Sequence, residues 1–143
     1  MKKILTFSLV ALMSSVVLAT PITLQHVTTT YANSGICSAA IDVTLHDFLG
    51  EQDKLYLDLV AKDKAGKIQG TSIDELNSDD VQNISGQAFG KVFIESENMC
   101  AADRTWTVEV KRAVLITDGK RKDLLKAKEV SANDFQPMKF KVN

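Results

Sequence analysis

The chain has 143 residues, of which 45% are hydrophobic and 24% charged, so it is long enough to bury one core of ordinary size. Its 17 basic and 18 acidic residues nearly cancel. A net charge so close to zero is a poor match for nucleic acid or an anionic membrane surface, and we expect no partner of either kind.

The N-terminal residues have the features of a removable export signal. Two early lysines precede an apolar run over residues 4–17, which is too short for a comfortable membrane span, and Ala19 ends a small-residue cleavage site. We expect a signal peptide over 1–19 and a single β-sandwich domain over 20–143. Losing both lysines leaves 15 basic against 18 acidic residues, a net charge of −3. The mature protein is then secreted or periplasmic.

Period-two alternation predicts strands in the first half of the domain, because successive side chains of a strand leave on opposite faces. The pattern covers 22–31, expected near a sheet edge, then 38–49, 54–62 and, more weakly, 67–73. Turn-forming clusters separate these ranges, and Gly66 suits a positive φ in one of them. The segment 74–85 is ambiguous, since a short helix or an irregular connection fits it.

The strongest strand pattern begins at residue 105. It alternates first, with Trp106 on the apolar side, and then becomes an unbroken apolar run over 113–116, which predicts a strand buried on both faces or one crossing between sheets. Asp118-Gly119 predicts a tight type I′ hairpin turn. The following residues, 120–130, either pair back as a strand or form a helical turn.

Residues 91–97 and 138–142 add two shorter strands. Many short strands separated by turns predict an all-β fold, an antiparallel β-sandwich, with an open barrel as the alternative. Cys37 and Cys100 are expected to form one disulfide, because thiols are oxidised outside the cytoplasm; two buried free thiols are the alternative. Closing a loop of this length contributes roughly 4 kcal/mol in the chain-entropy model, as an upper figure.

No catalytic or metal-binding template fits the sequence, so we expect neither an enzyme nor a cofactor. His26 and His46 are expected at the surface or a sheet edge, and two scattered histidines cannot supply a zinc site. His46 and Asp47 are adjacent, so their side chains leave a strand on opposite faces and cannot form a catalytic pair. An acidic cluster lacks the spacing of a calcium loop and is expected to be solvated loop charge. It comprises Asp74, Glu75, Asp79 and Asp80.

Three other features have a functional and a simpler interpretation. The basic tip Lys120-Arg121-Lys122 could steer an acidic partner, but exposed turn charge is the simpler account. Asn83-Ile84-Ser85 matches a short glycosylation sequon that is common by chance. Trp106 is expected in the core. The partner-binding residues stay unknown at this stage, although loops at sandwich ends and open sheet edges are the usual binding surfaces.

The whole chain resembles the interleukin receptor mimic proteins, which are small secreted bacterial antigens. The resemblance is carried by the leader MKKILTFSLVALMSSVVLA, by the opening TPITLQHVTTTYANSGIC, and by the Cys37 and Cys100 pair in a mature domain of this size. It implies an immunoglobulin/fibronectin type III-like sandwich similar to cytokine-receptor binding domains. It also implies a virulence-associated protein that binds host interleukin-2, interleukin-4 and interleukin-10 and modulates immune signalling. A domain-swapped homodimer is implied as well.

Two other functions fit an exported disulfide-bearing sandwich. One is a fimbrial or other periplasmic assembly subunit, and the other is a secreted enzyme inhibitor that presents a stiff loop. For the swapped dimer, residues 122–137 are expected to act as the hinge ahead of the terminal strand, because their periodicity is weak. Exchange of a terminal strand replaces the same contacts in trans and costs little beyond association entropy.

Overall fold

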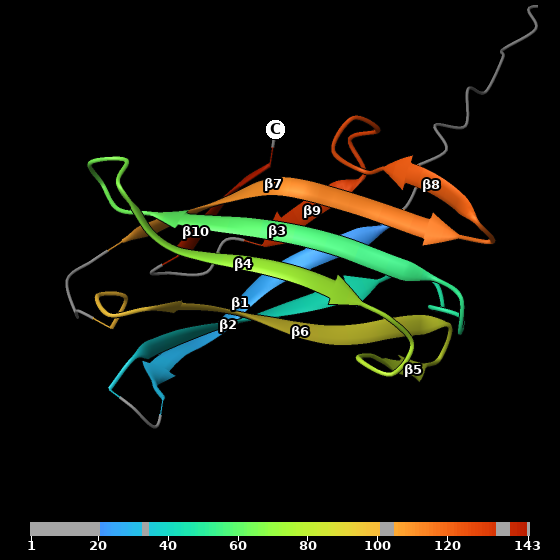
Figure 1. The fold of residues 1–143 in the computed structure, drawn as a ribbon, viewed down its shortest axis with the longest axis horizontal. Helices are drawn as coiled ribbons and strands as arrows, with labels where there is room; N and C mark the ends of the chain where they lie inside the picture. Colours follow the sequence, from blue (N-terminus) through green and yellow to red (C-terminus); the bar gives the residue numbers. More distant parts are fainter. Residues whose placement is uncertain (1–20, 33–34, 101–104, 134–137, 143) are drawn as a thin grey trace, which may run out of the picture.

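The computed structural model describes residues 21–32, 35–100, 105–133 and 138–142, and Figure 1 shows their fold. The expected signal peptide over 1–19 lies outside these residues. No helix in the described part of the chain is long and apolar enough to cross a membrane. The strands there are β1 (Ile22–Tyr31), β2 (Cys37–Leu45), β3 (Lys54–Lys62), β4 (Ile68–Leu76), β5 (Gln82–Ile84), β6 (Gln87–Ser96), β7 (Trp106–Thr117), β8 (Lys120–Asp123), β9 (Val130–Asn133) and β10 (Met138–Val142).

The strands form two sheets that pack face to face (Figure 1), which confirms the predicted all-β sandwich. Sheet I has the order β5-β6-β2-β1-β9, and sheet II has the order β10-β7-β3-β4, with β8 also paired to β7. Strands equivalent to A, B and E of an immunoglobulin-type sandwich therefore share one sheet, and those equivalent to C and F share the other. Most pairs are antiparallel, but β9 runs parallel to β1, and β10 parallel to β7.

The core lies between the sheets and follows the alternation seen in the sequence. In β3, Leu55, Leu57, Leu59 and Ala61 are all fully buried, and the residues between them face solvent. Trp106 is 1% exposed and belongs to the same apolar cluster, which confirms its expected place in the core. Burial of these side chains contributes about 1.5–3 kcal/mol for each large aliphatic residue, which makes the inter-sheet contact the main stabilising term.

Close backbone approach joins the two sheets along the side formed by β4 and β6. A Cβ added at Gly70 would lie 2.7 Å from the Glu95 carbonyl oxygen and 2.9 Å from a methyl carbon of Ile94. Gly70 is not at a positive φ, so glycine is required there by space and not by backbone conformation. On the opposite side of the sandwich, β9 and β10 contact each other and extend the two sheets.

Some predicted boundaries are wrong. Residues 74–85 hold no helix: β4 continues to Leu76, a turn follows, and β5 then pairs with β6. The second strand ends at Leu45 because the next residues bend into the β2–β3 connection. The apolar run of β7 stays within one sheet, and Ala113 and Val114 are buried on its two faces.

The disulfide between Cys37 and Cys100 is present, with the Cα atoms 5.5 Å apart. Cys37 begins β2 and is fully buried, and Cys100 lies in the connection that follows β6. The bond therefore ties the start of β2 to the chain that leaves its neighbour β6, at the end of the sandwich opposite the β7–β8 hairpin.

Candidate functional site

A cavity of about 520 Å³ lies at one end of the sandwich, between the β2–β3 connection and the β7–β8 hairpin. This end is at the right of Figure 1. Its apolar lining comes from the ends of strands, where Leu45 and Leu124 are buried and Leu115 is partly buried. Its rim is polar and comes from the two loops. An apolar floor with a polar rim is the usual make-up of a binding pocket. We call these loops and their cavity the loop end.

The β2–β3 connection is held rigidly by its own contacts. Asp53 accepts hydrogen bonds from the backbone N–H of Gly50 at 2.8 Å and from that of Asp118 at 3.1 Å, and so joins this connection to the β7–β8 hairpin. Leu49 is buried in the core, and its backbone N–H and C=O both bond the side-chain amide of Asn83. A loop fixed in this way loses little conformational entropy when a partner binds.

A chain of hydrogen bonds starting at His46 extends this support across sheet I. The Gln87 amide donates to His46 Nδ1 at 3.0 Å, and because that nitrogen accepts, His46 Nε2 carries the hydrogen and donates to Thr23 Oγ1 at 2.9 Å. The Thr23 and Ser131 hydroxyls are 2.9 Å apart, and Ser131 donates to the Ile22 carbonyl at 3.3 Å. The chain of bonds thus connects β6, the β2–β3 connection, β1 and β9.

Phe48 is the exposed aromatic residue of the loop end. It lies on the cavity rim with 53% of its surface exposed, on a connection whose neighbouring residues are anchored. An exposed aromatic ring on a preorganised loop is the usual form of an interface anchor. Sequence analysis missed Phe48, because the period-two pattern was extended through it as a strand and only the tertiary fold shows that its ring faces solvent.

The charges at the loop end are of both signs. Asp47 and Asp118 lie on the cavity rim with Lys122, whose ammonium is 2.6 Å from the Glu129 carboxylate. The turn before the basic tip has φ values of 51° at Asp118 and 71° at Gly119, which confirms the predicted type I′ hairpin. All three residues of the basic tip Lys120-Arg121-Lys122 are exposed in β8, next to these carboxylates. The loop end is therefore not a one-sign electrostatic patch.

The two histidines lie in different surroundings and have different structural roles. His46 is exposed, as expected, and serves as the hydrogen-bonding link described above. His26 lies in β1 just past the residues that pair with β9, but the surface position expected for it is wrong, because its side chain points into the sandwich and is only 4% exposed. Its Nε2 is 2.7 Å from the Thr29 hydroxyl, and burial lowers its pKa below the usual value. Their separate positions leave no histidine pair for catalysis.

The acidic cluster does not come together as a site. Glu75 lies in β4 and pairs with Lys54 at 2.5 Å, and Asp74 accepts from the Ser72 hydroxyl in the same strand. Asp80 accepts from the Asn77 backbone N–H in the turn that follows. These carboxylates are thus divided between a strand and a turn, so the cluster is not simply loop charge. No group of three or more ligand-type residues among the described residues could hold a metal ion.

The sequon has a structural explanation. Both polar atoms of the Asn83 side chain are bonded to Leu49, and Ser85 and Gly86 form the β5–β6 turn with φ values of 51° and 83°. Asn83 thus pins β5 to the β2–β3 connection.

Comparison with known proteins supports the fold. No family model and no curated protein sequence matches the chain. Among solved structures, the fold matches IrmA from Escherichia coli, the interleukin receptor mimic protein, with a TM-score of 0.53. The match has 21% sequence identity and covers 81% of this chain and 93% of that one. The resemblance predicted from the sequence is therefore confirmed as a likeness of fold.

Proposed function

We propose that this chain is a secreted, non-catalytic protein that binds host interleukins by mimicking their receptors. The carrying observation is the fold likeness to IrmA over most of both chains. The disulfide agrees with an oxidising, extracytoplasmic location. Interleukin-2, interleukin-4 and interleukin-10 are the first candidates, with virulence-associated modulation of immune signalling as the outcome of binding.

The loop end is the surface we assign to this binding. It combines an exposed aromatic ring, an apolar cavity and charges of both signs on loops that are fixed by Asp53, Asn83 and His46. These properties suit a protein partner, because aromatic anchors on preorganised loops carry most of the energy in protein interfaces.

The edge of β7 is occupied by the chain's own β8 and β10. An assembly subunit that takes a donated strand leaves an edge of this kind open, so this pairing favours the receptor-mimic function over the fimbrial one.

A pair of phenylalanine variants tests the assignment. Phe48→Ala removes the ring from the loop end, and Phe93→Ala removes a ring of similar exposure, 50%, from β6. We expect Phe48→Ala to weaken interleukin binding at least ~10-fold, as for an interface anchor, and Phe93→Ala to leave it within about twofold. Calorimetric titration at low protein concentration gives both affinities. Equal effects of the two variants would contradict the loop-end assignment, and an absence of binding by the unsubstituted protein would contradict the function itself.

A strand-swapped homodimer is a further part of this proposal. β10 pairs with β7 of its own chain from Met138 opposite Trp106 to Val142 opposite Val110. The same pairs can form between two chains, with the expected hinge over 122–137, of which 134–137 lie outside the described residues. A dimer formed in this way persists on dilution, because separating it requires β10 to leave its sheet. A protein that is monomeric in size-exclusion chromatography over a broad concentration range would rule it out.

A further inference from the structure

Positive charge is concentrated on one part of the outer face of sheet II. Glu109 of β7 is 8% exposed, and three lysine ammonium groups surround its carboxylate. They belong to Lys111 of the same strand at 2.6 Å, Lys62 of β3 at 3.0 Å and Lys141 of β10 at 4.0 Å. Three positive charges against one negative charge leave this group with a net charge of +2.

The strand register places a fourth lysine beside this group. Lys139 of β10 lies opposite Thr107 of β7, and Thr107 lies opposite Lys62 of β3. Lys139 is exposed and pairs with no carboxylate among the residues that the structure describes. We call the four lysines, Lys62, Lys111, Lys139 and Lys141, together with Glu109, the lysine patch. Four positive charges against one negative charge give it a net charge of +3.

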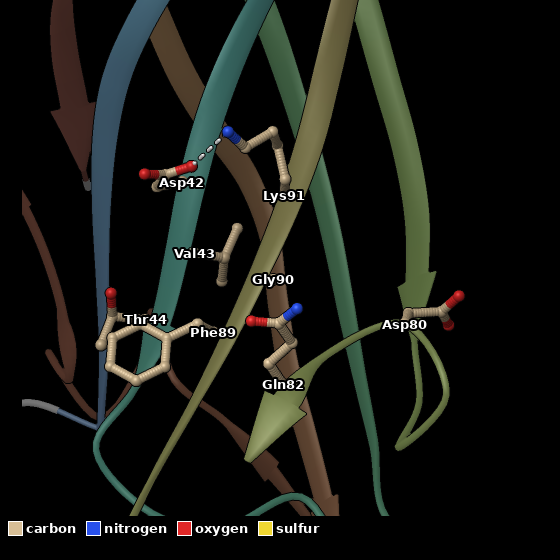
Figure 2. Close-up of a pocket in the computed structure, with 8 residues that line it drawn as sticks. All are labelled: Asp42, Val43, Thr44, Asp80, Gln82, Phe89, Gly90 and Lys91. Atoms are coloured by element: carbon tan, nitrogen blue, oxygen red, sulfur yellow. Dashed lines mark ion pairs between the residues drawn. The ribbon is translucent and has the colours of Figure 1, made fainter. Parts of the chain in front are cut away.

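Exposed lysines elsewhere on the sheets are neutralised one to one. Figure 2 shows Lys91 of β6 reaching across to Asp42 of β2, at a distance of 3.1 Å. On the far part of sheet II, Lys54 pairs with Glu75. The whole chain has a net charge of −1, so the lysine patch is a local excess of positive charge on a weakly acidic protein. A surface of one sign attracts a ligand of the opposite sign over a long range.

We propose that the lysine patch binds a sulfated polysaccharide, a chain that repeats anionic groups along its length. Lys139 and Lys62 lie two strands apart, roughly 10 Å, and the patch extends roughly 14 Å along β7 from Thr107 to Lys111. Several sulfates can therefore be bound at once. Lysine ammonium groups are point charges on flexible stems, so they can follow sulfates whose positions vary along a chain.

The residue types of the patch favour this ligand over other polyanions. The four cations are all lysines, and none supplies the planar fork with which arginine binds carboxylate or phosphate in a bidentate manner. Single-stranded nucleic acid is held by aromatic rings on which its bases stack. Among the described residues of β3 and β7, the aromatic ring on the outer face is that of Tyr56, and the Arg112 guanidinium already lies 5.2 Å from its centroid.

The lysine patch is compatible with the other two binding features of the protein. β3 ends at Lys62, at the left of Figure 1 and opposite the loop end, so both surfaces can be occupied together. The inference therefore does not rest on the proposed interleukin binding. In a strand-swapped dimer, Lys139 and Lys141 come from the other chain through the same pairing with β7. Each of the two patches then keeps all four lysines.

Removal of the three most exposed lysines tests the proposal. Calorimetric titration of the purified, oxidised protein with a size-defined heparin oligosaccharide, at about 50 mM salt, gives the affinity. The test variant combines Lys111→Ser, Lys139→Ser and Lys141→Ser, and leaves the half-buried Lys62 in place. An ammonium ~4 Å from an anion in water contributes about fivefold to affinity, so we expect the triple variant to bind at least ~30-fold more weakly. The slope of log affinity against log salt concentration should also fall, by up to about one for each lysine removed.

A second triple variant with the same change in net charge is the matched control. It combines Lys54→Ser, Lys91→Ser and Lys120→Ser, three exposed lysines outside the patch, and should bind within about threefold of the unsubstituted protein. Urea unfolding checks that both variants fold. Equal losses of affinity in the two variants, or no binding of the oligosaccharide by the unsubstituted protein, would overturn the proposal. So would equally tight binding of polyglutamate or single-stranded DNA of matched charge, because the patch would then not select sulfated polysaccharide.

Discussion

Substitution of Gly70 by alanine tests how the two sheets are joined. The new Cβ would lie 2.7 Å from the Glu95 carbonyl oxygen, a distance that real Cβ atoms do not adopt. The contacted atom belongs to the backbone, so β4 and β6 must separate. Overpacking of this kind costs about 1–3 kcal/mol. Alanine also restricts the unfolded chain more than glycine does, and this loss of unfolded-state entropy stabilises the folded protein by about 0.4–1 kcal/mol. We expect a net loss of about 1–2 kcal/mol.

Gly90 offers a matched control in β6. A Cβ there would meet methyl carbons of Val81 and Leu76 at 3.1 and 3.3 Å, and these side-chain atoms can move by a few tenths of an ångström. We expect Gly90→Ala to change the free energy of unfolding by less than about 0.5 kcal/mol. Urea unfolding of the oxidised protein, followed by Trp106 fluorescence, measures both variants. Equal stabilities for Gly70→Ala and Gly90→Ala would refute the argument that backbone contact closes this side.

Three other predictions concern single interactions. Hydrogen bonds from Lys111 and then Lys62 lower the pKa of Glu109 to about 2. The contribution of Glu109 to stability is therefore complete above pH 4.5 and is lost as the pH falls towards 2. Unfolding measured at a series of pH values should show the stability difference between the unsubstituted protein and Glu109→Gln shrinking from pH 4.5 to pH 2. Replacing both disulfide cysteines by serine should cost at most about 4 kcal/mol in urea unfolding, and an unchanged midpoint would contradict the bond's role. Asn83→Ala should lower the free energy of unfolding by about 1 kcal/mol and speed hydrogen exchange of the Leu49 amide, because both side-chain bonds from Asn83 to Leu49 are lost. Exchange at an unchanged rate would show that the β2–β3 connection does not need the Asn83 side chain.

Alternation predicted the longer strands well. The expected ranges 22–31 and 54–62 match β1 and β3, and the Asp118-Gly119 turn falls where it was expected. These features depend on local residue pattern and on the φ values that a type I′ turn requires, so they can be read from sequence. The strand β5 was missed because three residues are too few to show a period.

The relative direction of paired strands and the burial of polar side chains were predicted less well. The parallel pairings of β9 with β1 and of β10 with β7 could not be predicted, because alternation is the same for a parallel and an antiparallel neighbour. His26 was expected at the surface or a sheet edge, yet its side chain lies on the inward face of β1. Ile22 and Leu24 precede His26 at steps of two and are buried, so the alternation of β1 itself indicated the inward face for this histidine.

The loop end could not be predicted from sequence at all. Its cavity is formed by segments that are some seventy residues apart in the chain, near Phe48 and near Asp118. The residues that hold it, such as Asp53 and Asn83, are ordinary turn residues whose partners appear only when the sheets are in place. Sequence analysis could name sandwich ends as a class of binding surface, and the structure identifies which end has an anchored aromatic ring and a cavity.

The most direct test of the proposed function is binding of the purified, oxidised protein to interleukin-2, interleukin-4 and interleukin-10, with an unrelated secreted sandwich as the control. Receptor mimicry predicts saturable binding above the control and a loss of that binding in Phe48→Ala. No binding at micromolar concentrations would contradict the receptor-mimic function and leave the fold unaffected.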